Sequence, residues 1–192
     1  VTGNSKIKID GHNLTEYDLY HLRNSMSIVP QDPFLFSDSI KNNIKFGKED
    51  ATDEEIITAA KMAVVDDNIQ SFTNKYETIL GERGITLSGG QKQRVSIARA
   101  IIKEAPILIL DDCLSAVDTE TEEKIVNNFK TIFNEKTTII VTHRASAAKN
   151  ANKIIVLDSG RIVQEGTHNQ LVNQEGFYKD LYTKQLSEKE NA

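Results

Sequence analysis

The sequence has few of the features that mark disulfide-rich, secreted or membrane-embedded proteins. It contains one cysteine, no tryptophan and three prolines in 192 residues. The single cysteine, Cys113, excludes an internal disulfide and fits a reducing compartment, and we interpret it as a small buried residue. No apolar run approaches the ~18 residues that span a bilayer, and no charged-then-apolar signal segment opens the chain. Any association with a membrane therefore requires another segment or subunit.

Positive charge is scarce as well. The chain has 23 lysines and arginines against 28 acidic residues, which gives a net charge of −5, and its pI is near 5.4. Such a chain offers no basic field to a polyanion, so we expect no nucleic acid partner. The remaining composition, 39% hydrophobic and 27% charged, is that of a globular protein with one sizeable core.

Strand and helix patterns alternate along most of the chain. Apolar runs bounded by turn residues predict strands, and apolar residues at helical spacing predict the helices between them. The pattern predicts strands at 6–10, 27–29, 107–111, 137–142, 154–157 and 162–164, and helices near 17–23, 40–46, 119–133 and 145–149. Two more helices are predicted: one over 53–64, behind the start signal that opens with Thr52, and one that starts after Ser88 and runs through Ala98. This alternation favours a parallel sheet with right-handed crossovers. Residues 158–161 predict a hairpin turn, and 167–189 fit two amphipathic helices.

Two segments indicate nucleotide chemistry. Leu87-Ser88-Gly89-Gly90-Gln91 places a hydroxyl and sterically permissive backbone N–H groups at the start of a helix, where the amide dipoles favour an anion. The apolar run 107–110 then ends in Asp111 and Asp112. Open α/β sheets hold ligands at this end of their strands, and a metal bound to phosphate needs oxygen ligands there.

These segments resemble the signature motif and the Walker B strand of the nucleotide-binding domains of ATP-binding cassette (ABC) transporters. The resemblance covers residues 1–192 as the C-terminal portion of one ABC ATP-binding domain. It implies an α/β fold, a partial P-loop NTPase (RecA-like) core with a parallel sheet, formed by residues 1–33 and 86–192. An α-helical signature subdomain, residues 34–85, would be inserted into that core.

The resemblance also implies roles for individual residues. Asp111 would hold Mg²⁺ through water, and Gln31, in the Q-loop position, would be a second Mg²⁺ ligand. Asp118 closes a segment, residues 115–118, that resembles the D-loop, and it also fits the N-cap of the next helix. Both roles can hold together. The implied contacts to ATP come from Gln31, Ser88, Gly89, Gly90, Gln91 and Asp118.

Asp112 and His143 would carry hydrolysis. The family usually has glutamate at the position of Asp112, where it polarises the attacking water, and His143 resembles the switch histidine that contacts the γ-phosphate. Aspartate is one methylene shorter, and a misplacement of about 1 Å can cost ~10²-fold in rate. We therefore expect weak hydrolysis at this chain's own site. That favours a heterodimer with a second ABC nucleotide-binding domain over a homodimer in which water or loop shifts compensate.

Two further segments point to the exporter branch of the family. Residues Thr78 to Gly84 resemble the x-loop, which touches the coupling helices of the transmembrane domain, and residues 30–36 are also exporter-like. The implied function is ATP-driven dimerisation that powers export of a drug, lipid or peptide, with the domain at the cytoplasmic face of the cell membrane. The alternative is a soluble ABC ATPase of translation or DNA repair.

The sequence lacks the P-loop pattern Gly-x-x-x-x-Gly-Lys-Ser/Thr. Its opening residues resemble the family segment that follows the P-loop helix, so we interpret the chain as an N-terminally truncated fragment. Without the P-loop lysine and backbone donors we expect the isolated chain to bind ATP poorly and to be inactive. We also expect an uncovered sheet edge to cause self-association. An interaction module that has lost its chemistry is the remaining alternative.

Overall fold

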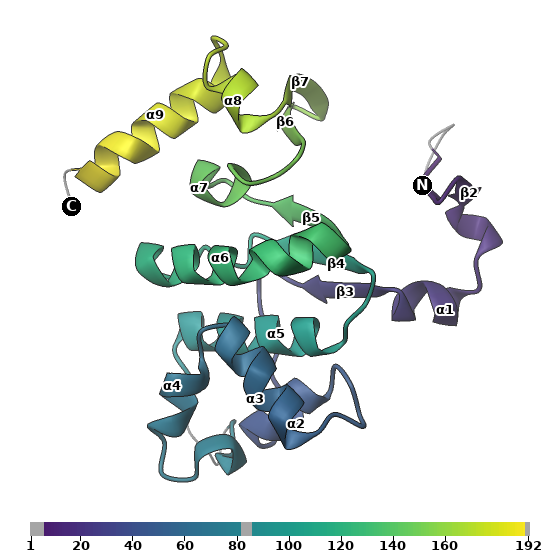
Figure 1. The fold of residues 1–192 in the computed structure, drawn as a ribbon, viewed down its shortest axis with the longest axis vertical. Helices are drawn as coiled ribbons and strands as arrows, with labels where there is room; N and C mark the ends of the chain where they lie inside the picture. Colours follow the sequence, from purple (N-terminus) through teal and green to yellow (C-terminus); the bar gives the residue numbers. More distant parts are fainter. Residues whose placement is uncertain (1–5, 82–85, 191–192) are drawn as a thin grey trace.

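A three-stranded parallel sheet lies at the middle of the molecule (Figure 1). The computed structural model describes residues 6–81 and 86–190. The sheet has the order β3 (Met26–Val29), β4 (Ile107–Asp111), β5 (Thr137–Val141). All three strands run parallel, with Val29 opposite Leu110 and Asp111 opposite Val141. The predicted α/β fold with a parallel sheet is therefore confirmed.

Helices α5 (Gly89–Ile102) and α6 (Thr119–Glu135) pack with this sheet into the main core. Leu108 and Leu110 of β4 are buried, as the two-residue period of a strand requires. Ile125 and Phe129, one turn apart on α6, are fully buried. Burial of each such side chain contributes ~2 kcal/mol to folding.

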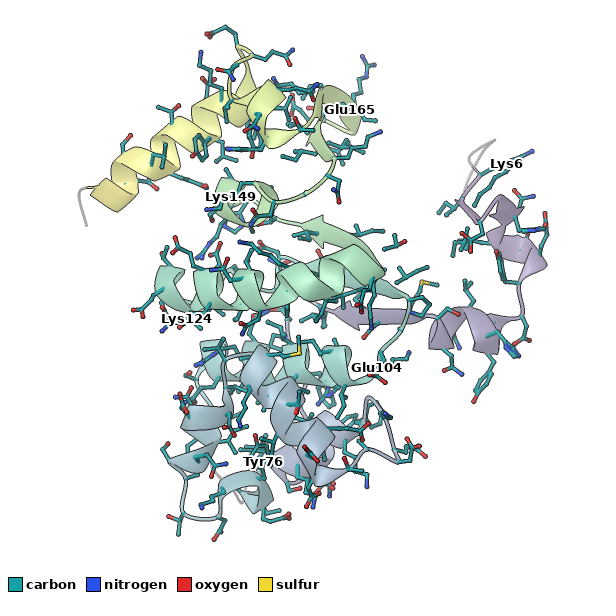
Figure 2. All side chains as sticks on the ribbon, viewed as in Figure 1. Lys6, Tyr76, Glu104, Lys124, Lys149 and Glu165 are labelled. Carbon is teal, nitrogen blue, oxygen red and sulfur yellow. The ribbon has the colours of Figure 1, made fainter. Side chains whose placement is uncertain are left out.

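The described part of the segment between β3 and α5 is mainly helical. It contains α2 (Ile40–Lys45), α3 (Asp53–Met62), α4 (Asp66–Gln70) and the short η2 (Lys75–Glu77), which lie below α5 in Figure 1. Thr52 is the N-cap of α3 and forms a capping box, in which its side chain accepts from Glu55 N while the Glu55 side chain accepts from Thr52 N. Tyr76, labelled in Figure 2, donates to Asp66 Oδ1 at 2.7 Å and joins η2 to α4. Helix α5 contacts α2 and α3 as well as β3.

The N-terminal residues form a hairpin followed by short helices. Strand β1 (Lys8–Ile9) pairs with β2 (His12–Asn13), and η1 (Leu14–Glu16) and α1 (Leu19–Asn24) follow. The prediction of one strand over 6–10 is therefore wrong at its end. Asp10 and Gly11 have φ angles of 50° and 83°, which turn the chain back on itself.

The C-terminal part forms a second layer around its own small core. Strands β6 (Ile154–Asp158) and β7 (Arg161–Gly166) make a separate antiparallel pair, followed by α8 (His168–Leu171) and α9 (Phe177–Glu190). The predicted hairpin is confirmed, but the placement of 154–157 in the parallel sheet is wrong. Ser159 and Gly160 adopt φ angles of 49° and 76°, which form a tight turn between the two strands. Strand β6 therefore pairs with β7 and not with the parallel sheet.

The short α7 (Ala145–Ala148) joins the sheet to this C-terminal layer. Among residues 6–81 and 86–190, β5 has no strand on its other edge. No helix in the described part of the chain combines the length and the apolar character needed to cross a bilayer.

Candidate functional site

The three parallel strands bring several predicted site residues to one edge of the sheet. Asp111 is the last residue of β4, Gln31 follows β3 by two residues and His143 follows β5 by two. Because the strands are parallel and in register, these positions lie at the same carboxyl edge. This is the edge at which the sequence predicts nucleotide binding.

Asp112 and His143 are in direct contact. Nδ1 of His143 lies 2.9 Å from Oδ1 of Asp112, and the two side chains are 65% and 16% exposed. Nε2, the other ring nitrogen of His143, is not part of this contact. The backbone of Asp112 has a φ of 43° and donates from its N–H to Val141 O at 2.8 Å. This hydrogen bond holds the backbone of Asp112 next to the end of β5, two residues before His143.

The oxygen atoms at the strand ends suit a hard cation. Asp111 is half-buried and Gln31 is exposed, and together they offer a carboxylate and a neutral amide oxygen from neighbouring strands. This donor set fits Mg²⁺. Across residues 6–81 and 86–190, no three metal-ligating side chains are already grouped. Such a cation would therefore need further ligands from phosphate and water.

The signature segment forms a capped helix start. Ser88 Oγ accepts from Gln91 N at 3.2 Å, and Gln91 Oε1 accepts from Ser88 N at 2.9 Å. These two side chains, predicted as ATP contacts, therefore also form a capping box. A Cβ atom on Gly90 would lie 2.8 Å from Ala116 O. The signature segment thus packs directly on the 115–118 loop.

Asp118 is the N-cap of α6. Its Oδ1 accepts from Thr121 N at 2.9 Å. This hydrogen bond to the ionised form, together with the Arg94 guanidinium, lowers the pKa of the Asp118 carboxyl. The capping role predicted from the sequence is confirmed, and an additional contact to ATP stays a prediction.

Sequence reasoning missed a buried ion pair beneath this loop. Glu122 on α6 is 2% exposed and pairs with Arg144, which follows His143 in the chain. Arg144 also donates to Ser115 O at 3.0 Å and to Val117 O at 3.3 Å, and Ser146 donates to Glu122 at 2.7 Å. The spacing of Glu122 from Ile125 and Val126 places it on the buried face of α6, and that spacing was a usable signal.

A second set of missed residues holds the segment after β3. Gln93 on α5 is 1% exposed and donates to Gln31 O at 2.8 Å. Arg99 on the same helix donates to Phe34 O at 2.8 Å and to Asn43 O at 2.7 Å. The signature helix therefore supports the backbone of the predicted Q-loop.

The surface near the predicted x-loop is partly apolar. Ile79 bridges to Ser39 and is 48% exposed, while Glu82 to Gly84 of this segment lie outside the described residues. Phe34 and Phe46 nearby are 66% and 64% exposed, and both lie near Phe36, over which the Arg99 guanidinium sits at 5.3 Å. An exposed aromatic group of this kind marks a contact surface.

Comparisons with known proteins agree with this arrangement. The sequence model of the family described as ABC transporter matches residues 2–115. The chain is 48% identical over 176 residues to an ATP-dependent lipid A-core flippase of Legionella pneumophila (strain Lens), covering 92% of this chain and 30% of that protein. It is 47% identical over 178 residues to a protein of Staphylococcus aureus (strain NCTC 8325 / PS 47) named as a multidrug export ATP-binding/permease protein, covering 93% and 31%.

A solved structure gives the same result. A bacterial Atm1-family ABC exporter with ATP bound matches with a TM-score of 0.89 at 40% identity, covering 94% of this chain and 32% of that chain. The likeness confirms the P-loop NTPase type of α/β fold. The chain spans about a third of the length of these relatives. Because the family model matches more than half of its residues, the chain belongs to the ABC transporter family.

Proposed function

We propose that this chain is part of the ATP-binding and ATP-hydrolysing domain of an ABC exporter. Membership of the family implies nucleotide binding. The observation that carries the proposal is the meeting of Asp111, Asp112 and His143 at one sheet edge, with His143 Nδ1 2.9 Å from Asp112 Oδ1. A carboxylate and an imidazole in contact can orient a water molecule and stabilise charge on a phosphate.

Each residue at the edge has a proposed role. Asp111 and Gln31 hold Mg²⁺ with ATP, and the metal supplies neutralisation of phosphate charge. Asp112 polarises water and is positioned by its backbone turn, while Nε2 of His143 is directed to the γ-phosphate. Ser88, Gly89, Gly90 and Gln91 contact ATP bound to a second domain.

The proposed partner is a second ABC nucleotide-binding domain. The capped, exposed start of α5 offers the N-terminal end of a helix to an anion on another molecule, and the 115–118 loop beside it would join the two sites. A heterodimer is favoured because Asp112 is shorter than glutamate and hydrolysis here is expected to be weak. We propose that the predicted signature subdomain, residues 34–85, turns relative to the sheet.

A transmembrane domain is the second proposed partner. The exposed side chains of Phe34, Phe46 and Ile79 give an apolar surface for its coupling helices. We infer that the domain works at the cytoplasmic face of the cell membrane. The exported solute is a drug, lipid or peptide, and the relatives named as a lipid A-core flippase and a multidrug exporter support the lipid and drug classes. They also count against a soluble ABC ATPase.

The test uses the full-length protein in vesicles. We expect Asp111→Asn to weaken binding of Mg²⁺ and ATP at this chain's own site more than about tenfold, because the lost charge weakens the hold on Mg²⁺. The control is Asp67→Asn, which makes the same change at an exposed residue of α4. Fluorescent lipid and cationic dye, assayed in parallel, distinguish the solute classes. Undiminished binding of Mg²⁺ and ATP in Asp111→Asn would contradict the assignment.

A further inference from the structure

The backbone that carries His143 is held from two sides. On one side, the Arg144 guanidinium donates to Ser115 O and Val117 O and pairs with the buried Glu122 carboxylate. On the other side lies the C-terminal helix α9, which was not predicted to lie near the site. The link from α9 is made by Gln185.

Gln185 binds the backbone of both neighbours of Arg144. Its Nε2 donates to His143 O at 3.0 Å, and its Oε1 accepts from Ala145 N at 2.8 Å. Only one orientation of the amide satisfies both bonds, so the donor and acceptor assignment is fixed by the contacts. Ala145 N belongs to the first turn of α7, which has no acceptor of its own within the helix. Gln185 therefore supplies an acceptor that this buried N–H requires.

The position of Gln185 is set by the packing of α9. Tyr178, Leu181 and Tyr182 of this helix pack in the small C-terminal core together with Ala145. Gln185 lies seven residues after Tyr178 and three after Tyr182, so it shares their face of the helix. The docking position of α9 therefore determines where the Gln185 amide contacts the backbone of residues 143–145.

We propose that Gln185 is a positioning residue for His143, through which α9 sets the reach of the imidazole toward the γ-phosphate. The inference rests on the proposed function of His143. The His143 side chain is 65% exposed, so packing confines it little and its place depends on its backbone. A shift of that backbone moves Nε2 by the same amount, and misplacement of about 1 Å is costly at a reacting phosphate.

The experiment compares nucleotide preference in the full-length protein. Because hydrolysis at this site is expected to be weak, binding of a slowly hydrolysed ATP analogue relative to ADP is the readout. Gln185→Leu should reduce that preference roughly fivefold, the worth of one hydrogen bond. His143→Ala should do the same, and the double variant should lose no more than either alone. Gln185→Glu keeps the acceptor for Ala145 N and should restore part of the preference. Additive losses would overturn the proposal.

Hydrogen exchange gives a second readout that needs no nucleotide. Loss of the Gln185 acceptor should speed exchange of the Ala145 amide, while Lys184→Met, on the exposed side of α9, should not. Unchanged exchange of the Ala145 amide in Gln185→Leu would show that Gln185 does not hold the backbone of residues 143–145. If the wild-type protein binds no nucleotide, the proposed function fails, and the exchange result alone decides whether Gln185 holds the segment.

Discussion

Gly90 is the residue at which the signature segment tolerates least change. A Cβ there would lie 2.8 Å from the backbone oxygen of Ala116, whereas a Cβ on Gly89 would meet Ala116 Cβ at an ordinary 3.9 Å. We expect Gly90→Ala to destabilise the chain by ~1–3 kcal/mol, because a backbone atom must move. Gly89→Ala should be neutral or slightly stabilising, since alanine favours the helix. Urea unfolding of the 192-residue chain measures both. Equal losses would contradict the contact.

At the scale of elements, α6 and the segment after β5 are joined through one buried charge pair. Removing the Glu122 carboxylate leaves Arg144 without its partner, so we expect Glu122→Leu to cost ~3–5 kcal/mol in the same unfolding measurement. Glu122→Leu combined with Arg144→Met should recover most of that loss, because no charge is then left unpaired. A double variant as unstable as the single one would show that the pair acts through packing alone.

The elements that could be predicted are those with local signals. The side chains of Thr52, Ser88 and Asp118 are each typical of a helix start. All three accept a hydrogen bond from a backbone N–H in the first turn of their helix, as expected. The pairing of β6 with β7 could be predicted from its local turn, but the separation of this pair from the parallel sheet could not, because it depends on residues elsewhere in the chain. The contacts of Arg144 with Glu122 and of Gln185 with His143 could not be predicted for the same reason, because these pairs lie 22 and 42 residues apart in the sequence.

At the scale of the whole molecule, the described sheet ends at β5 with apolar residues uncovered. Ile139 and Val141 of this strand are 49% and 51% exposed, and Leu157 of β6 is 68% exposed. In Figure 1, β5 lies at the upper edge of the sheet, and β6 lies beside β7 in the layer above it. An edge of this kind can pair with another strand, which supports the expectation that the isolated chain self-associates.

In the proposed heterodimer, the signature segment and the residues at the sheet edge contact different ATP molecules. Variants in these two groups should therefore have different effects on ATP hydrolysis. Ser88→Arg places a bulky charge where the partner's ATP would close, and we expect it to lower turnover of the full-length complex more than about tenfold. Asp112→Asn affects only the site at which hydrolysis is already weak, so turnover should stay within about twofold. Thr58→Arg, at an exposed position of α3, controls for the added charge. ATP hydrolysis in vesicles measures all three variants. Comparable losses from Ser88→Arg and Asp112→Asn would argue instead for a symmetric homodimer, in which the shorter acid is fully competent.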